Sequence, residues 1–518
     1  MRVSADFSKL YYYVPSAPNE NPLTIEADLC IYGGTAAGIA AAVQARRMGL
    51  TAVIAEFSRK IGGISASGLG ATDHGRKEAI GGLAKQFYRD LGTYYGTSNE
   101  DGCVWYFEPS AAQRIYKEWL EKAEVPVYCE QHLAAVDKKA GRIAQITMEN
   151  GNVFRAKMFI DASYEGDLMA KAGVSYHVGR ESNAVYGETR NGIQFGSRNH
   201  MFNAAVDPYV IPGKPDSGLL PCVMDADPGT PGQGDRSIQA YNFRICLTDN
   251  PENRVPIPLP PQYDPKRYEL LARYVRAGIW DFRQKNTRMP NQKTDTNNYG
   301  AFSTDHIGAN FGWPEGDYAT RERIFQDHVN YTIGLLYFIA NDESIPRGLR
   351  QERQQWGLAA DEFTDTANWP HQLYVREARR MISDVVMTEK HCQHLETVTD
   401  SIGMASYTMD SHNCRRLVLE GFAVNEGNVE IPVPGPYPIS YRSIVPKGDE
   451  CVNLFVPVCL SASHIAYGSI RMEPVFMILG QSAATAAAMA IEAGVPVQEV
   501  PYPQLRERLI RDGQVLNL

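Results

Sequence analysis

Four side chains in this sequence stand in settings where residues of their type do chemistry: His464, His412, His306 and Arg471. A neutral imidazole accepts a proton near neutral pH, and a guanidinium binds a carboxylate through two parallel hydrogen bonds. We therefore expect a histidine to act as a proton acceptor, and Arg471 to bind a carboxylate group of the substrate. The alternative for Arg471 is a salt bridge to Glu473 or to another carboxylate of the protein.

A glycine-rich turn near the N-terminus predicts a nucleotide site. Residues 33–38 read Gly-Gly-Thr-Ala-Ala-Gly, between a predicted strand over 28–32 and a predicted small-residue helix over 39–48. Glycines at such a turn let backbone N–H groups approach a pyrophosphate at a helix N-terminus. A second predicted strand, residues 51–55, is followed by Glu56, and an acid at that position accepts hydrogen bonds from ribose hydroxyls. This order of elements predicts dinucleotide binding.

The elements that must position these residues fall into two groups, one from the two ends of the chain and one from its middle. Apolar runs predict strands over 125–128, 144–148, 153–160 and 454–458, and helices are predicted over 111–123, 318–341 and 473–493. Residues 181 to about 300 are dense in Pro, Gly and Asn, which is typical of loops and edge strands. We predict an α/β fold, with a discontinuous Rossmann-like domain and an inserted, loop-rich α+β substrate domain. The predicted segments are an N-terminal arm (1–24), the first part of the nucleotide-binding domain (25–180), the inserted domain (181–439), the second part (440–500) and a C-terminal tail (501–518).

Composition excludes several classes of protein. The chain has 518 residues, 44% hydrophobic and 21% charged, which is globular composition and excludes wholesale disorder. A net charge of −9 argues against binding of nucleic acid through the overall charge of the protein. Nine scattered cysteines, with no CxxC pair, argue against a disulfide scaffold and a structural zinc site. We expect no metal.

Two segments bear on location. Residues 1–20 are polar and contain no signal peptide pattern. Residues 474–493 form the only long apolar stretch, which polar residues such as Gln481 and Thr485 interrupt, so we expect a buried helix and no membrane span. The default location is the cytoplasm, and an export signal that has been removed stays open as an alternative.

Several motifs together resemble the FAD-dependent oxidoreductase family, in the glutathione-reductase-like class of flavoproteins. The resemblance runs from about residue 25 to 500, with the flavoprotein subunits of succinate dehydrogenase and fumarate reductase as more distant kin. The motifs that carry it are residues 33–38, Glu56, residues 62–65 with 68–73, residues 159–162 with 165–167, and residues 463–474.

The resemblance implies where FAD binds. The first glycine turn holds the diphosphate, the segment after the second strand runs along the diphosphate and flavin, and the helix that opens near Glu473 directs its N-terminus at the flavin. The expected cofactor-binding residues are Gly33, Gly34, Thr35, Ala36, Ala37, Gly38, Glu56, Phe57, Gly62, Gly63, Ile64, Ser65, Ala162, Ser163, Asp167, Ser463, Glu473, Pro474 and Gly480.

The sequence departs from the class at one place. Many of these flavoproteins carry a Gly-Asp pair after the last core strand, whereas residues 459–463 here read Cys-Leu-Ser-Ala-Ser. No acid is therefore assigned to the ribitol or diphosphate, and Ser461 or Ser463 becomes the candidate donor. We also expect FAD to be held without a covalent bond, because the sequence around His74 does not match that of histidyl-flavin proteins.

The predicted function is hydride transfer between a substrate C–H bond and the flavin, most simply oxidation of a secondary alcohol on a sugar or hydroxy acid. One alternative is reduction or desaturation of an unsaturated acid, which two substrate-facing arginines would favour. Another is a flavin-bearing binding or accessory module without turnover. The expected partners are a small-molecule substrate and an electron acceptor that the sequence does not name, with no nucleic acid.

His464 is the first candidate for the proton acceptor. It follows the last predicted core strand and precedes the helix aimed at the flavin, so a loop there would place its side chain near the reactive ring. The sequence thus predicts that His464→Ala keeps FAD but loses about 10²–10⁴-fold in the rate of flavin reduction. His412 and His306 follow as candidates.

Overall fold

The structure is a computed structural model that describes residues 6–281 and 285–518. Its main sheet has seven strands, in the order β3-β2-β1-β6-β5-β4, with β20 paired to β6. Strands β1, β2, β3, β6 and β20 are parallel, whereas β4, β5 and β6 pair antiparallel. The strands are β1 (Thr24–Tyr32), β2 (Ala52–Ala55), β3 (Val127–Tyr128), β4 (Leu133–Lys139), β5 (Arg142–Met148), β6 (Val153–Asp161) and β20 (Leu454–Phe455).

The parallel part of this sheet brings the ends of three strands together. Ile31 lies opposite Ile54 on β2 and Ile160 on β6, and Tyr32 lies opposite Asp161. The ends of these strands are buried, as expected for a parallel sheet whose two faces are both covered. In such sheets ligands bind outside the carboxyl ends of the strands, so the turns after Tyr32, Ala55 and Asp161 meet at one potential site. The predicted α/β class with a Rossmann-like sheet is confirmed.

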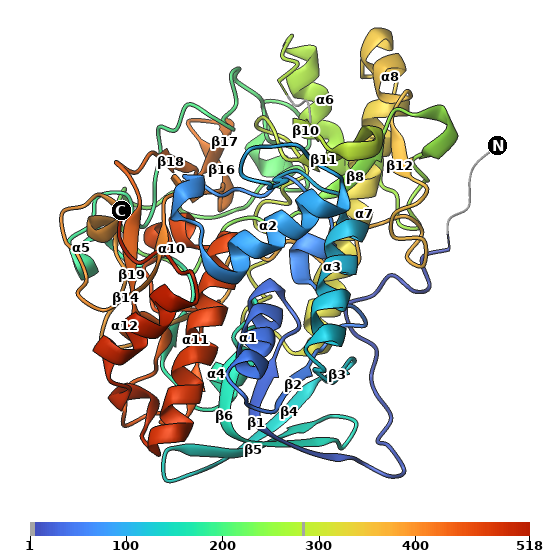
Figure 1. Ribbon diagram of the computed structural model, residues 1–518. Helices are drawn as coiled ribbons and strands as arrows, with labels where there is room; N and C mark the ends of the chain where they lie inside the picture. The colour runs from blue at the N-terminus through green and yellow to red at the C-terminus, as the bar shows by residue number, and fades with distance from the viewer. Residues whose placement is uncertain (1–5, 282–284) are drawn as a thin grey trace.

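Helices from both ends of the chain cover this sheet. The main helices around it are α1 (Ala36–Arg47), α2 (Gly82–Tyr94), α3 (Pro109–Lys122), α4 (Asp167–Lys171), α10 (His464–Ile470), α11 (Glu473–Ala493) and α12 (Tyr502–Arg511). Figure 1 shows α1 in blue beside α11 in red, above the strands at the base of the molecule. In addition, β20, which comes from the C-terminal part of the chain, pairs with β6 and extends the sheet by one strand. The C-terminal part of the chain thus completes the unit that the N-terminal part begins.

Helix α11 has the bounds that the sequence predicts. It is the one helix of the described residues that is long and apolar enough to cross a membrane, and 89% of its apolar window is buried inside the structure. Gly480 lies where α11 meets α1, and a Cβ at this position would overlap the backbone oxygen of Ala37. The smooth, small-residue face therefore serves close helix packing.

This contact yields the first prediction. Gly480→Ala should lower the free energy of unfolding by about 1–3 kcal/mol, because the added methyl group must push α11 away from the backbone of α1. Unfolding in urea measures the change. Gly348→Ala is the control, since a Cβ at Gly348 meets nothing within 4 Å. An equal loss in both variants would contradict the explanation by close contact.

The middle of the chain forms a second region, which lies above the main sheet in the view of Figure 1. It contains a five-stranded antiparallel sheet in the order β10-β11-β8-β12-β9 and the long helix α7 (Tyr318–Asn341), whose bounds agree with the prediction. Its sheet strands are β8 (Ile245–Thr248), β9 (Arg254–Val255), β10 (Lys285–Arg288), β11 (Lys293–Asn297) and β12 (Gly357–Ala359). The other helices are α5 (Asn183–Tyr186), α6 (Glu269–Arg276), α8 (Arg347–Arg353) and α9 (Glu389–Cys392).

Four two-stranded sheets lie outside the two larger sheets. They pair β7 (Tyr176–His177) with β13 (Arg380–Met381), β14 (Ser401–Ala405) with β19 (Tyr437–Ser440), β15 (Met409–Ser411) with β18 (Val429–Ile431), and β16 (Arg415–Leu419) with β17 (Phe422–Glu426). The stretch predicted as loops and edge strands thus contains a buried sheet as well. Its strand β8 is apolar but only four residues long, and β11 is too polar in sequence to show a clear strand pattern. One hydrophobic cluster extends through both regions, from Leu29 of β1 to Ile333 of α7.

Candidate functional site

The turn after β1 is built for close backbone approach. Gly33 has a φ of +107°, and a Cβ at this position would lie 2.8 Å from the backbone of Ala162 and Ser163. Thr35 caps α1 by accepting the N–H of Gly38, and its hydroxyl donates to the carbonyl of Ala162 at 2.8 Å. The first N–H groups of α1, including those of Ala36 and Ala37, have no acceptors within the helix, so they are available to an anion.

Glu56 lies at the end of β2, against this turn. Its carboxylate is buried and accepts the backbone N–H of Gly34 on one oxygen and that of Ser58, at 2.8 Å, on the other. Burial raises the pKa of Glu56. A carboxylate has about four acceptor positions, so each oxygen retains one for a ribose hydroxyl.

A third group extends the turn toward α11, in the short helix η1 (Gly63–Ala66). The N–H of Gly62 donates to the carbonyl of Gly34 at 2.7 Å, and the N–H of Ile64 donates to the hydroxyl of Tyr164 at 3.1 Å. The hydroxyls of Tyr164 and Ser65 donate to the two carboxylate oxygens of Glu473, at 2.8 and 3.2 Å.

These three groups form what we call the cofactor cradle: Gly33–Gly38, Glu56, Gly62–Ser65, Ala162–Tyr164 and Glu473. Glycines at close backbone approaches, an acid at a strand end and an open helix N-terminus are the donor and acceptor set that a dinucleotide requires. The residues present therefore fit FAD. Tyr164 was missed by the sequence analysis, although it lies between the two parts of one motif, residues 159–162 and 165–167.

Glu473 makes the cradle sensitive to pH. Burial raises its pKa to about 7. Because the folded protein then holds this proton more tightly than the unfolded chain, its stability falls as pH rises from about 4.5 through 7. The loss amounts to roughly 3 kcal/mol, the equivalent of about 2.5 pKa units.

Glu473→Gln should remove this part of the pH dependence. We expect the difference in free energy of unfolding between pH 5 and pH 8, measured in urea on the cofactor-free protein, to become smaller by roughly 3 kcal/mol. Glu100→Gln, at an exposed position, is the control and should leave the difference unchanged. An unaltered pH dependence in Glu473→Gln would show that this carboxyl is ionised in the folded protein at neutral pH.

Five predicted cofactor residues lie outside the cradle. The carboxylate of Asp167 accepts hydrogen bonds from Arg321, at 2.6 and 2.8 Å, and from Arg379, at 2.7 Å. Ser463 caps α10 and donates to Glu188 at 2.6 Å. Phe57 packs on Tyr12, with ring centroids 5.2 Å apart. Gly480 and Pro474 belong to α11, Pro474 within its first turn as predicted and Gly480 against the backbone of Ala37.

A polar cavity of about 500 Å³ lies next to the cradle. We call it the substrate cavity. It is joined to the cradle by two short connections, because Asp73 continues the segment from η1 and Arg471 stands two residues before Glu473. Its lining residues are Asp73, Arg198, Asn199, His200, Asn203, Arg244, Asp281, Asn297, Asn298, Tyr299, Gly300, Tyr374, Tyr407, Thr408, Asp410, His412, Asn428, Glu430 and Arg471.

His412 is the predicted histidine that reaches this cavity. Its Nδ1 lies 2.7 Å from a carboxylate oxygen of Asp305, and its Nε2 lies 3.5 Å from Asp410. Asp305 is buried and pairs with Arg376 at 2.9 Å. Burial alone would raise the pKa of Asp305, but the positive charge of Arg376 and the hydrogen bond from His412 outweigh it and lower the pKa. An ionised Asp305 therefore holds the Nδ1 proton of His412 and leaves Nε2 as a proton acceptor.

Two of the three arginines that line the cavity are already paired, whereas the third, Arg198, is exposed and has no hydrogen bond or ion pair among the described residues. Arg471 donates to a carboxylate oxygen of Asp410 at 3.0 Å and to the hydroxyl of Tyr374 at 3.1 Å. Arg244 binds Asp295 through two hydrogen bonds, at 2.8 and 2.6 Å. The salt-bridge alternative for Arg471 is thus the one observed, with Asp410 as the partner in place of Glu473.

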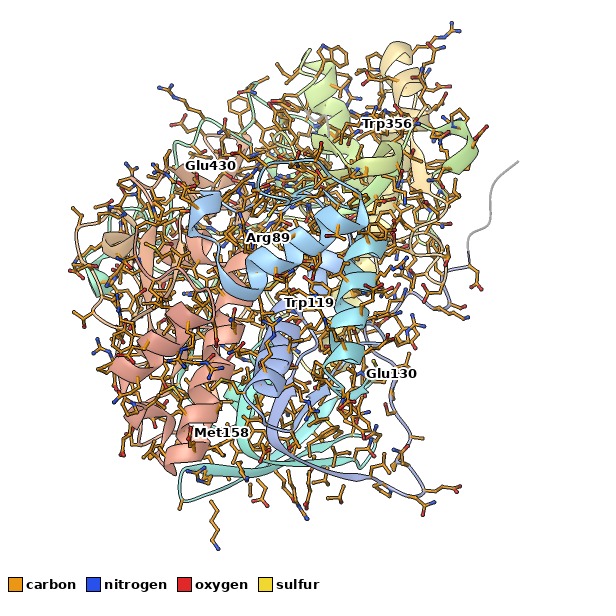
Figure 2. The ribbon with its side chains drawn as sticks, viewed as in Figure 1. Arg89, Trp119, Glu130, Met158, Trp356 and Glu430 are labelled. Atoms are coloured by element: carbon orange, nitrogen blue, oxygen red, sulfur yellow. The ribbon has the colours of Figure 1, made fainter. Side chains whose placement is uncertain are left out.

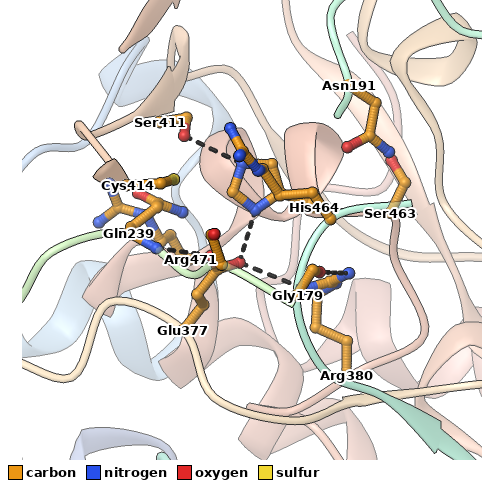
Figure 3. Close-up of polar contacts among 12 residues, drawn as sticks. Gly179, Asn191, Gln239, Glu377, Arg380, Ser411, Cys414, Ser463, His464 and Arg471 are labelled. Atoms are coloured by element: carbon orange, nitrogen blue, oxygen red, sulfur yellow. Dashed lines mark hydrogen bonds and ion pairs between the residues drawn. The ribbon is translucent and has the colours of Figure 1, made fainter. Parts of the chain in front are cut away.

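His464 does not stand in a loop, so that expectation is wrong. It is the first residue of α10 and only 1% exposed, because the short helix begins directly after Ser463 and packs into the interior. Figure 3 shows its ring between Ser411 and Glu377, with Nε2 at 3.0 Å from the serine hydroxyl and Nδ1 at 2.9 Å from the carboxylate. It does not line the substrate cavity.

Two other histidines also lie away from the cavity. His306 is buried, stacks on Tyr331 with centroids 4.0 Å apart, and bonds to Asp327 at 2.9 Å. His74 lies beside Trp105 at 4.8 Å, and its Nδ1 is 2.7 Å from the carbonyl oxygen of Gly75. Their partners lie within the protein, so these rings are held for packing.

A larger surface groove lies apart from the polar cavity, and one lining residue of each, Trp119 and Glu430, is labelled in Figure 2. Glu430 marks the cavity, whereas Trp119 lies in a groove of about 870 Å³ between α1, α2 and α3, which contains none of the predicted catalytic or cofactor residues. The described residues also contain no cluster of three or more His, Cys, Asp or Glu that could hold a metal ion. The sequence analysis missed Asp305, the partner of the cavity residue His412, although it lies in residues 302–310, a segment from which only His306 was proposed.

The chain matches a known protein family over most of its length. The model of the family described as FAD dependent oxidoreductase matches residues 28–509. No curated protein matches the sequence. Similar solved structures include the L-amino acid deaminase from Proteus vulgaris (16% identity, 32% of this chain and 55% of that chain, TM-score 0.25). Another is p-nitrophenol 4-monooxygenase PnpA from Pseudomonas putida DLL-E4 (15%, 32% and 51%, 0.23). The chain thus spans about half the length of these structures.

Proposed function

Because this chain belongs to the FAD dependent oxidoreductase family, we propose that it oxidises a secondary alcohol on a neutral, polyhydroxylated substrate such as a sugar. FAD, when bound, supplies the hydride acceptor. The observation that carries the proposal is His412, which lines the substrate cavity with Nδ1 fixed by Asp305 at 2.7 Å.

The cavity lining supports a neutral substrate. It is rich in amide and hydroxyl groups, which donate and accept hydrogen bonds without charge. These groups belong to Asn199, Asn203, Asn297, Asn298, Asn428, Tyr299, Tyr374, Tyr407 and Thr408. Hydroxyl groups of a sugar both donate and accept, so such a lining can satisfy them on several sides. All nine of these residues come from segment 181–439, which we propose as the substrate domain.

The paired arginines weigh against the alternative, an unsaturated acid. That substrate is best bound by two guanidinium groups, whereas Arg471 and Arg244 already bind Asp410 and Asp295 and leave only the exposed Arg198 for its carboxylate. Removing either guanidinium from its aspartate would leave a buried or half-buried carboxylate without its cation, at a cost of several kcal/mol.

The mechanism assigns one role to each group around His412. Nε2 accepts the proton of the substrate hydroxyl as the carbon–hydrogen bond breaks. Asp305 holds the ring in orientation through Nδ1 and stabilises the imidazolium that forms, and Asp410, at 3.5 Å from Nε2, adds a second negative charge near it. Arg376 keeps Asp305 ionised.

The test is anaerobic reduction of the bound flavin by two matched panels, neutral sugars and polyols against 2-hydroxy acids. We expect bleaching of the flavin absorbance by members of the first panel. Bleaching by hydroxy acids alone would contradict the assigned substrate class and return the arginines to a substrate-binding role. Bleaching by neither panel would contradict the proposed reaction.

A further inference from the structure

A small cavity lies beside Glu56, at the adenosine end of the cofactor cradle. The ribose acceptor Glu56 continues into Phe57, Ser58 and Arg59, which line this cavity together with Glu130 from the turn after β3. In dinucleotide-binding folds the acid after the second strand binds the adenosine ribose, so the residues that follow it adjoin the base. Glu130 marks this position in Figure 2, on the opposite side of the view from Glu430 of the substrate cavity.

The outer wall of this cavity comes from the N-terminal segment Lys9–Tyr13, which we call the tyrosine strap. The ring of Tyr12 packs between Phe57, at 5.2 Å, and Trp313, at 4.7 Å. The guanidinium of Arg59 lies 4.5 Å over the ring of Tyr11 and also donates to the backbone of Lys9. The strap therefore covers the residues that follow the ribose acceptor.

One helix anchors the strap. The carboxylate of Glu322 on α7 accepts the backbone N–H groups of Tyr12 and Tyr13, at 2.7 and 2.8 Å. One turn further, Gln326 donates to the carbonyl of Leu10 at 2.8 Å and to Glu322 at the same distance. Hydrogen bonds to a charged acceptor are roughly twice as strong as neutral ones, so Glu322 is the main anchor.

With the strap seated, the cavity measures about 20 Å³, which is room for about one water molecule. A purine ring cannot enter this space until the strap moves. We infer that the tyrosine strap is the adenosine-binding wall of the FAD site, an inference that rests on FAD binding at the Gly33 turn. It opens to admit or release the cofactor, and it closes again on the adenine with Tyr11, Tyr12 and Arg59. Aromatic rings and a guanidinium plane are the surfaces on which a purine stacks.

The test measures the release of FAD from the purified holoenzyme, followed as the rise in flavin fluorescence after dilution. Glu322→Gln keeps the shape of the side chain but removes the charge that holds the strap, and we expect about tenfold faster release. Tyr12→Ala removes the ring that fills the wall and should accelerate release in the same direction. Arg323→Gln is the matched control, one residue away on the exposed face of α7, and should leave the release rate unchanged.

Three results would overturn the inference: unchanged release in both variants, equal acceleration in Arg323→Gln, or equal acceleration of FAD and FMN release. FMN lacks the adenosine moiety, so a true adenosine wall cannot change its release. If Glu322→Gln does not fold, Tyr11→Ala replaces it, since that ring is outside the anchor and its loss must still speed the release of FAD. Release is measured without substrate, so failure of the proposed alcohol oxidation leaves this outcome unaffected.

Discussion

His412→Gln should lower the limiting rate of flavin reduction by about 10²–10⁴-fold, the usual contribution of a general base. The physical reason is the loss of the proton acceptor whose Nδ1 is fixed by Asp305 at 2.7 Å at the wall of the substrate cavity. FAD should stay bound, because His412 has no contact with the cofactor cradle. Stopped-flow mixing of the FAD-loaded variant with substrate under anaerobic conditions measures the rate.

His464→Gln is the matched comparison. The sequence alone predicted the catalytic loss at this residue, but its ring is enclosed by Ser411 and Glu377. We expect its replacement to lower the free energy of unfolding, because it leaves buried partners unsatisfied, with the chemical step near normal. A large rate loss in His464→Gln, together with a normal rate in His412→Gln, would restore His464 as the proton acceptor.

Asp305→Asn tests whether Asp305 orients the His412 ring for proton transfer or only supports the fold. Asp305 is a positioning residue, since it acts on the substrate through His412. The amide of the new Asn can donate its N–H to Nδ1 of His412. The ring proton would then lie on Nε2, which faces the cavity and could no longer accept the substrate proton. The limiting rate should then fall across the whole pH range while FAD stays bound, whereas a merely structural role would lower the free energy of unfolding and leave the limiting rate unchanged.

Gly33→Val should yield a protein without bound FAD. Gly33 has a φ of +107°, a conformation that L side chains rarely adopt, and its added Cβ would lie 2.8 Å from the backbone of Ala162 and Ser163. The turn must therefore move away from β6, and the backbone N–H groups at the start of α1 move with it. Absorbance of the purified variant near the flavin bands, before and after added FAD, measures the loss.

Gly34→Val gives the graded comparison. A Cβ on Gly34 would meet the Glu56 carboxylate at 3.1 Å and Ile61 at 3.2 Å, and both neighbours are side chains that can shift. We expect weakened but measurable FAD binding in Gly34→Ala and its loss in Gly34→Val. Full FAD content in Gly33→Val would mean that the diphosphate is held elsewhere, and the cradle as defined would be wrong.

The cofactor half of this protein was largely readable from the sequence. The strand, glycine turn, helix, strand and terminal acid over residues 28–56 are local signals, and each is set by neighbours within a few residues. Helices Tyr318–Asn341 and Glu473–Ala493 were predicted to the residue because long periodic or apolar runs, with Pro near the start of the second, define their ends. The short strand Leu454–Phe455 was predicted too long, because its apolar run continues after the sheet pairing stops.

The catalytic half was decided by tertiary structure. His412 and Asp305 are 107 residues apart, and neither the pair nor its approach to Asp410 leaves a pattern in either segment. His464 has the more suggestive neighbours in sequence, yet α10 carries it inward against Glu377, whereas β15 ends beside the cavity and presents His412 there. The sequence by itself determined that the chain binds a dinucleotide, since backbone geometry is encoded locally. Which histidine meets the substrate depended on how distant segments pack, since burial and ion pairing are properties of the folded chain.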